Sequence, residues 1–343
     1  MDKILVTGGL GFIGSHTVVE LHNKGYEVLI IDDLSNSEIE TIARIQSITG
    51  KQPLFEQIDL KVESEVKRVF EKHNDIKGVI HFAASKAVGE SMDKPLEYYE
   101  NNINALVYVL KAVRRLSFKN FIFSSSCTVY GEADAMPITE DAPVKPAESP
   151  YGNTKQMGEE IIRDLCRAER DFSAYSLRYF NPIGAHESGK LGELPIGIPA
   201  NLIPFITQTA AGIREELSVF GDDYNTPDGT CIRDYIHVVD LAKAHIIALE
   251  RLIDETKTEK NYDVFNLGTG RGNSVLEVIK AFESVTNQKL NYKITKRRSG
   301  DIVQAYADTT KANDVLGWKA EMSLETALLH SWQWQQHLKV IKN

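Results

Sequence analysis

Two hydrophobic patterns alternate along the first half of the chain. Short apolar runs predict strands at residues 3–7, 27–31, 53–57, 78–82, 120–123 and 174–179. Segments with apolar positions three and four residues apart predict helices at residues 15–24, 63–72, 95–116 and 151–168. Regular alternation of strand and helix predicts an α/β fold with a doubly wound parallel sheet.

The pattern changes after residue 186. Glycine and proline interrupt residues 184–204, and only short apolar runs follow, at 217–220, 263–267 and 290–294, before a helical pattern at 323–337. We therefore predict a dinucleotide-binding domain over residues 1–181, rejoined by about 233–262. The remainder of 182–343 is predicted to form a smaller α+β substrate lobe, interleaved with the first domain.

The first predicted strand runs into a glycine-rich turn. Gly8, Gly11 and Gly14 precede the first helix, and glycine there lets the chain turn tightly and lets a pyrophosphate approach the helix N-terminus. The spacing is Gly-x-x-Gly-x-x-Gly and not the commoner Gly-x-Gly-x-x-Gly. Such turns also occur in ordinary loops, so a cofactor role for this one depends on the residues of the next strand.

A carboxylate ends the second predicted strand at the expected distance from the turn. Asp32 lies eighteen residues after Gly14, where an acidic side chain accepts hydrogen bonds from an adenosine ribose. Asp33 comes next and no arginine stands beside the pair, so a 2′-phosphate would be repelled and NAD is favoured over NADP. The alternative is a solvated acidic loop.

Three further segments are candidates for the same cofactor site. Asp59 is placed to meet an adenine amino group, or else to cap the following helix. The small residues at 83–85 leave room for a flat ring, although small residues also serve plain packing. Asn101 and Asn102 interrupt a helical pattern that disfavours asparagine, so they either tie that helix to the cofactor loop or form an exposed polar face.

Tyr151 and Lys155 are four residues apart in a predicted helix and therefore share a face. A lysine cation near a phenol favours the phenolate, which allows the tyrosine to act as a general base near neutral pH. A Tyr-Lys pair at this spacing also occurs on ordinary helix faces. Hydroxyl side chains at 124–126 end the fifth predicted strand, where a doubly wound sheet has its ligand crevice.

Composition narrows the setting. The 343 residues carry a net charge of −9 spread along the chain, which argues against a nucleic-acid or membrane surface. Cys127, Cys166 and Cys231 have neither paired nor metal-like spacing, so we predict no disulfide framework and no metal site. No apolar run approaches the length of a membrane span, and we expect a soluble, cytoplasmic protein.

Several longer strings identify a family. They are residues 8–14, 86–91, 95–99, 123–131, 177–182 and 233–238, together with Asp32, Tyr151 and Lys155. Nearly the whole chain resembles the extended short-chain dehydrogenase/reductase family, and within it the UDP-hexose 4-epimerases. The resemblance implies tightly held NAD and a UDP-sugar between two lobes. It also implies that UDP-galactose and UDP-glucose are interconverted through a 4-keto sugar, with no net redox change.

The resemblance also assigns residues to roles. The catalytic set is Tyr151 as acid/base, Lys155 on the nicotinamide ribose and lowering the Tyr151 pKa, and Ser126 on the 4-hydroxyl. The NAD set is Gly8, Gly11, Phe12, Ile13, Gly14, Asp32, Asn36, Asp59, Leu60, Phe82, Ala83, Ala84, Lys86, Asn101, Ser124, Tyr151, Lys155 and Tyr179. The UDP-sugar set is Lys86, Ser126, Tyr151, Phe180, Asn181, Asn201, Leu202, Phe220, Arg233, Tyr235, Arg298, Asp301 and Ala305. Arginines suit a diphosphate entering an anionic protein, although Arg233 and Arg298 also fit a surface ion pair.

Competing functions within the family differ in a few side chains. The 4,6-dehydratases use an Asp-Glu pair just after the Ser/Thr position, where this chain has Cys127 and Thr128, so elimination is disfavoured. A decarboxylase, a 4-reductase and a catalytically silent NAD-binding protein remain as alternatives.

Substrate range and assembly are further expectations. Ala305 replaces a bulky tyrosine of some epimerases and leaves room for an N-acetyl group, unless the neighbouring Tyr306 enters the pocket instead. The resemblance further suggests a homodimer formed by helices within 96–116 and 151–168.

Overall fold

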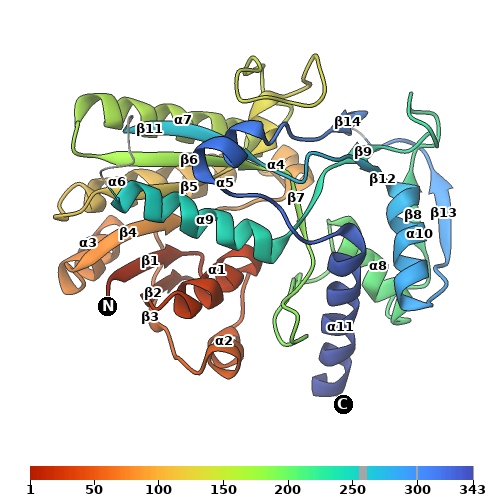
Figure 1. The fold of residues 1–343 in the computed structure, drawn as a ribbon, viewed down its shortest axis with the longest axis horizontal. Helices are drawn as coiled ribbons and strands as arrows, with labels where there is room; N and C mark the ends of the chain where they lie inside the picture. The colour runs from red at the N-terminus through yellow and green to blue at the C-terminus, as the bar shows by residue number, and fades with distance from the viewer. Residues whose placement is uncertain (255–260, 299, 343) are drawn as a thin grey trace.

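A seven-stranded parallel sheet forms the centre of the protein in a computed structural model, which describes residues 1–254, 261–298 and 300–342 (Figure 1). The strand order is β11-β6-β5-β4-β1-β2-β3. The bounds are β1 Lys3–Thr7, β2 Glu27–Asp32, β3 Leu54–Gln57, β4 Ile76–His81, β5 Asn120–Ser126, β6 Ser173–Tyr179 and β11 Tyr262–Leu267. This sheet confirms the predicted doubly wound α/β class.

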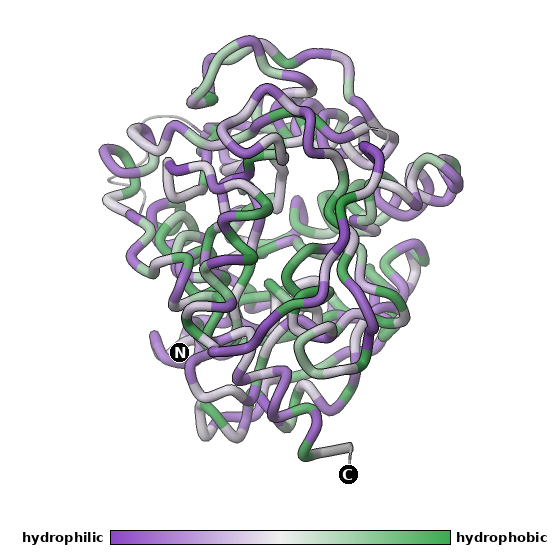
Figure 2. Tube along the Cα trace, turned by 90° about the vertical axis from the view of Figure 1, so that its right-hand side faces the viewer, coloured by the Kyte–Doolittle hydropathy of each residue, from purple (hydrophilic) through white to green (hydrophobic). Residues whose placement is uncertain are grey.

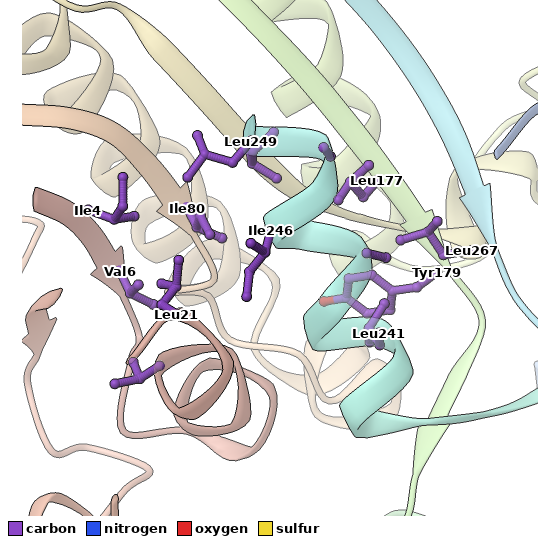
Figure 3. Packing of buried hydrophobic residues seen from close by; sticks show 14 of the residues in the cluster. Ile4, Val6, Leu21, Ile80, Leu177, Tyr179, Leu241, Ile246, Leu249 and Leu267 are labelled. Atoms are coloured by element: carbon purple, nitrogen blue, oxygen red, sulfur yellow. The ribbon is translucent and has the colours of Figure 1, made fainter. Parts of the chain in front are cut away.

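Helices cover both faces of the sheet. One face carries α1 (Phe12–Asn23), α2 (Thr41–Thr49) and α9 (Val238–Ile253), and the other carries α3 (Glu63–Lys72), α6 (Ala105–Val113) and α7 (Pro150–Ala168). Side chains alternate between the two faces along each strand, so Ile4 and Val6 pack toward α9 while Leu5 packs toward α6. Figure 3 shows the first of these two cores, between α9 and strands β1, β4 and β6.

The order of the strands reverses between β1 and β4. In a doubly wound sheet the connections on either side of such a point leave in opposite directions, which opens a crevice at the carboxyl ends of the strands. The glycine turn comes directly after β1, and the small residues at 83–85 come directly after β4. Both predicted cofactor segments therefore meet at this crevice.

The second lobe is built from short elements, seen on the right of Figure 1. It contains the pairs β10-β7 and β13-β8, and a three-stranded sheet ordered β12-β9-β14. The bounds are β7 Asn181–Ile183, β8 Leu217–Phe220, β9 Ile232–Arg233, β10 Tyr235–His237, β12 Asn273–Ser274, β13 Tyr292–Thr295, β14 Gln304–Ala305, α8 Leu202–Ala210, α10 Val275–Thr286 and α11 Leu324–Lys342. Helices α8, α10 and α11 share a separate hydrophobic core.

Three details differ from the sequence predictions. The strand predicted at 263–267 is β11, which pairs with β6 in the large sheet and does not belong to the smaller lobe. The helix predicted at 95–116 is a succession of α5 (Pro95–Tyr99), a π-helical turn η1 (Glu100–Asn104) and α6, which ends at Val113. The sequence patterns also missed α2, α8, α9 and α10. In α9, buried residues on several sides hide the apolar stripe by which a surface helix is recognised.

Within the described parts of the chain, the remaining elements are the short helices α4 (Val88–Asp93), η2 (Cys127–Tyr130) and η4 (Ala312–Leu316). Within the described residues, no helix is long and apolar enough to cross a membrane, and hydrophilic positions recur along the coloured part of the trace in Figure 2.

Candidate active site

The turn after β1 packs so tightly that glycine is required. Gly8 has φ +66°, and a Cβ atom there would lie 2.8 Å from the backbone nitrogen of Ala83. A Cβ atom on Gly14 would lie 2.3 Å from the carbonyl oxygen of Gly8. Gly11 caps the N-terminus of α1, and no side chain caps it there. The result is a cradle lined by backbone at a helix N-terminus, which suits a pyrophosphate.

Asp32 faces this turn from the end of β2. Its carboxylate accepts hydrogen bonds from the backbone nitrogens of Leu10 (3.0 Å) and Leu34 (3.1 Å) and from the hydroxyl of Ser37 (2.7 Å). The side chain is buried, so the solvated-loop alternative is wrong. Asn36 lies in the exposed turn that comes after Asp32.

Asp59 does not cap the helix that comes after it. Its carboxylate accepts from the Lys61 backbone nitrogen (2.8 Å) and lies 3.2 Å from the Lys61 ammonium, whereas the N-cap of α3 is Val62. Lys61 in turn contacts Asn101 (3.3 Å). These contacts connect Asp59 and Asn101, two of the predicted NAD-binding residues, and Leu60, which lies between Asp59 and Lys61, is buried.

The π-helical turn η1 ties its helix to the loop after β4. The Asn102 amide accepts from the Ser85 backbone nitrogen (2.8 Å) and donates to the Ser85 carbonyl (3.0 Å) and the Thr154 hydroxyl (3.0 Å). Asn101 donates to the Ser85 hydroxyl (3.1 Å). Asn102 is buried, so the exposed-face alternative is wrong. Thr154 lies between Tyr151 and Lys155, so this network reaches the predicted catalytic helix.

Tyr151 and Lys155 lie on the buried side of α7. The helix begins at Pro150, and the Ser149 side chain caps it by accepting from the Gly152 backbone nitrogen (3.1 Å). The Lys155 ammonium donates to the Ser124 carbonyl (2.7 Å) and lies 5.8 Å from the Tyr151 ring centre. The pair therefore lies at the carboxyl end of β5.

Burial governs the ionisation of both groups. It lowers the pKa of Lys155 to about 8, with Glu159 acting in the opposite direction. It raises the pKa of Tyr151 well above its usual range, while hydrogen bonding to Ser126 opposes the rise. Burial is thus the dominant influence on the phenol in this structure, and the lowering of the Tyr151 pKa by Lys155 stays a prediction.

The hydroxyl of Ser126 hydrogen-bonds with the phenol of Tyr151. Ser126 caps the turn η2 by accepting from the Thr128 backbone nitrogen (3.2 Å). The hydroxyls of Ser124 and Tyr179 form a buried hydrogen bond of 2.5 Å. Tyr179 ends β6, and Phe82 lies just after β4. The His245 ring contacts the rings of both residues.

Glu193 joins two predicted substrate residues from different lobes. Its carboxylate accepts from the Asn201 amide (2.8 Å) and lies 3.6 Å from the Lys86 ammonium. Lys86 comes from the loop after β4, and Asn201 precedes α8 and its first residue, Leu202. Glu193 itself lies in a glycine-rich stretch with no pattern to single it out in the sequence.

Arg233, Arg298 and Asp301 form an ion cluster in the second lobe. Asp301 lies 2.7 Å from Arg298 and 3.9 Å from Arg233. The Arg298 guanidinium stacks over the exposed ring of Phe220 at 5.6 Å. Both arginines are therefore ion-paired with Asp301 in this structure, and an exposed aromatic ring lies beside Arg298; their contact with a diphosphate stays a prediction.

The other predicted substrate residues lie on neighbouring strands. Phe180, Tyr235 and Ala305 are buried, and Asn181 begins β7, which pairs with β10. The Asp234 carboxylate binds these segments together through the backbone nitrogens of Thr269 (2.8 Å), Gly270 (3.1 Å) and Ala307 (3.2 Å). Asp234 belongs to the family string at 233–238, but the sequence predicted no role for it.

Comparison with known proteins agrees with this geometry. A family model described as GDP-mannose 4,6 dehydratase matches residues 5–330. A UDP-glucose 4-epimerase of Bacillus subtilis (strain 168) is 52% identical over 332 residues, covering 97% of this chain and 96% of the relative.

Solved structures of UDP-glucose 4-epimerases are also similar to this chain. A UDP-glucose-4-epimerase from Stenotrophomonas maltophila, with bound NAD and formylated UDP-arabinopyranose, superposes with a TM-score of 0.95 at 44% identity, covering 99% of this chain and 100% of that one. A UDP-glucose 4-epimerase from Bifidobacterium longum, in complex with NAD+ and UDP, gives 0.93 at 48% identity, with 98% of each chain covered. The chain belongs to the extended short-chain dehydrogenase/reductase family, in its UDP-glucose 4-epimerase branch.

The two side chains after Ser126 bear on the dehydratase alternative. Cys127 and Thr128 occupy the two positions that the dehydratase alternative needs for an acid and a base. Burial raises the pKa of the Cys127 thiol to about 11, so it stays protonated near neutral pH and cannot serve as a base.

The structure also decides between Ala305 and Tyr306 as the residue facing the buried side of β14. Ala305 packs with Phe180 and Val129 in one hydrophobic cluster. Tyr306 points to the opposite side, where its ring would lie 3.1 Å from a Cβ atom on Gly272. Successive residues of an extended segment face opposite ways, so of these two side chains only that of Ala305 lies in this cluster; its place at the sugar pocket stays a prediction.

Proposed function

We propose that this protein is an NAD-dependent UDP-hexose 4-epimerase that interconverts UDP-galactose and UDP-glucose. The observation that carries the proposal is the meeting of Ser126, Tyr151 and Lys155 at the carboxyl end of β5, beside the glycine turn at the point where strand order reverses. The relatives with this name cover nearly the whole chain, which supports the same activity.

The residues at the crevice fit NAD. The backbone cradle at Gly8 and Gly14 would hold the pyrophosphate, because a turn this tight, in which a Cβ atom at either position would clash with backbone, leaves its N–H groups open to the phosphates. The fixed carboxylate of Asp32 would accept the ribose hydroxyls, and its charge disfavours a 2′-phosphate. Lys155 would reach the nicotinamide ribose. When bound, NAD supplies a hydride acceptor for C4 and returns the hydride to it.

Tyr151 and Ser126 handle the proton of the 4-hydroxyl. The phenol is held protonated by burial, and Ser126 is close enough to stabilise its phenolate by hydrogen bonding. Tyr151 would take the hydroxyl proton when the sugar is oxidised and give it back from the same position when the 4-keto sugar is reduced. Lys155 contributes a cation whose proton is fixed toward Ser124.

The second lobe would bind the UDP group. Arg233 and Arg298 converge on Asp301, and a diphosphate offers them stronger partners than one shared carboxylate. Phe220 presents an exposed ring beside Arg298, on which a flat base can stack. Rotation of the 4-keto sugar between these phosphate contacts and Tyr151 exposes its opposite face to the same hydride source.

The buried position of Ala305 supports acceptance of N-acetylated UDP-hexoses as well. Ala305 places only a methyl group beside Phe180, where a tyrosine would place a phenol, and Tyr306 points away from it. Ala305→Tyr should suppress turnover of UDP-N-acetylgalactosamine while sparing UDP-galactose, since the discrimination is steric. Equal loss of both activities would contradict this assignment.

The predicted homodimer would use α5, α6 and α7. Leu96 at the start of α5 is 78% exposed and Met92 in the preceding α4 is 60% exposed. These apolar groups border the predicted interface, and sedimentation of Leu96→Glu against the unaltered protein tests it. The cytoplasmic location stays a prediction from the sequence.

The function itself is tested without added cofactor. Purified protein is given UDP-galactose, and UDP-glucose is measured afterwards with a UDP-glucose dehydrogenase. An epimerase with retained NAD converts the sugar under these conditions. A catalytically silent NAD-binding protein carries NAD and converts nothing, and a dehydratase releases a 4-keto-6-deoxy sugar instead.

A further inference from the structure

A buried ion pair lies one helical turn beyond Lys155. Both carboxylate oxygens of Glu159 are engaged by Arg178, whose Nε donates to Oε1 (2.9 Å) and Nη2 to Oε2 (2.5 Å). The Ser125 hydroxyl donates to the same Oε1 atom (2.5 Å). All three residues are at most 5% exposed. Glu159 is therefore saturated with donors inside the protein.

This saturation explains where the Lys155 ammonium points. Residues 155 and 159 share a face of α7, and a lysine and a glutamate at that spacing ordinarily pair. Here the ammonium donates to the Ser124 carbonyl at 2.7 Å, and the described residues include no ion pair between Lys155 and Glu159. The forked guanidinium of Arg178 takes the place that Lys155 would occupy.

The three residues of this hydrogen-bond network come from three elements of the site. Glu159 belongs to α7, Ser125 stands between Ser124 and Ser126 on β5, and Arg178 precedes Tyr179 on β6. The network thus fixes the register of α7 against the ends of both strands. That register decides whether Tyr151 meets Ser126 and whether Lys155 meets Ser124.

We propose that Glu159 and Arg178 are positioning residues for Lys155: Glu159 supplies a negative charge one turn away from the ammonium, and Arg178 holds that carboxylate so that it cannot capture the ammonium. This inference rests on the proposed function, in which Lys155 must stay free to hold a ribose and face Tyr151. Neither residue touches the sugar or the cofactor in this account.

The charged and titratable groups facing Lys155 leave Glu159 as its source of negative charge. On α7 they are Tyr151 and Glu159, on β4 His81, and on β6 Arg178 and Tyr179. Burial lowers the pKa of His81 to about 3 and raises the pKa of Tyr179 to about 12, so both are neutral near pH 7. Glu159 alone opposes the effect of burial on the pKa of Lys155.

The test measures the ionisation of Lys155 directly. Lysine labelled with ¹³C at Cε is incorporated, and the Lys155 signal is assigned by its loss in Lys155→Arg. In the unaltered protein it should titrate with a midpoint near 8. Glu159→Gln should move the midpoint to lower pH by about one pH unit, and Arg178→Gln should move it to higher pH, because the freed carboxylate then binds the ammonium.

A matched control comes from the next residue. Glu160 is exposed on the same helix, and Glu160→Gln should leave the midpoint unchanged. If Glu159→Gln does not fold, the double variant Glu159→Gln/Arg178→Gln removes both charges and should still lower the midpoint. Unchanged midpoints in folded variants would overturn the proposal. The titration needs no substrate, so it stands or falls separately from conversion of UDP-galactose.

Discussion

The two halves of the site are built differently. The large sheet holds Ser126, Tyr151 and Lys155 on strands and helices of up to nineteen residues, and these three side chains are less than 10% exposed. The second lobe presents Arg233, Arg298 and Phe220 from strands of two to four residues and from the loop after β13. Long buried elements hold the reacting side chains at fixed distances from one another. Short strands and loops at the surface leave room for a ligand to enter. We therefore assign chemistry to the first region and recognition to the second.

The largest effect should come from the first region. Tyr151→Phe removes the hydroxyl that carries the proton and leaves the buried ring in place, so the protein should fold and retain NAD. Its kcat should fall by about 10²–10⁴-fold. The measurement is turnover of UDP-galactose beside the NAD released on denaturation. Wild-type turnover in this variant would show that Tyr151 is not the acid/base.

Gly14→Ala should have the second-largest effect, because it alters the glycine turn that would hold the pyrophosphate of NAD. A Cβ atom 2.3 Å from the Gly8 carbonyl forces the turn apart, so NAD content per chain and the melting temperature should both fall. Gly89 in α4 is the control, since nothing lies within 4 Å of a Cβ atom there. Gly89→Ala should keep NAD, and equal NAD content in the two variants would count against the cradle.

Arg298→Met tests the recognition role assigned to the second lobe. Loss of a charge-assisted contact to phosphate should raise KM by roughly 10- to 100-fold and leave kcat nearly unchanged. Arg297 is the neighbouring control, because its guanidinium pairs with Asp223 (2.7 Å) and stacks on Tyr224. A fall in kcat as large as that of Tyr151→Phe would contradict the assignment of chemistry to the first region and recognition to the second.

The smallest effect should come from Lys86. Its ammonium lies 3.6 Å from Glu193 and is about half exposed, and exposed ion pairs contribute about 1 kcal/mol or less. Lys86→Met should therefore change KM by about fivefold or less. A larger effect would place Lys86 inside the recognition surface and not at its edge.

The sequence predicted the first region well because regular elements leave regular patterns. The strands β1 to β6, the glycine turn, Asp32 and the Tyr151-Lys155 pair all result from local periodicity and spacing. The second region was predicted poorly, since two-residue strands such as β9 and β14 have no period of their own. Their positions depend on pairing partners distant in sequence, as when Ala305 aligns with Arg233.

Side-chain partners were the hardest to predict in both regions. Glu159 and Arg178 are nineteen residues apart, and neither was given a role from the sequence. Only the packing of α7 on β6 shows that both are buried and paired. The same holds for Glu193, which connects Lys86 with Asn201 across the two lobes.

The central claim is that the hydrogen removed from C4 returns to C4 within one closed site. It is tested most directly with UDP-galactose deuterated at C4, incubated with the purified protein in ordinary water and no added cofactor. We expect UDP-glucose that retains the deuterium at C4. Conversion with loss of that deuterium to water would contradict the account.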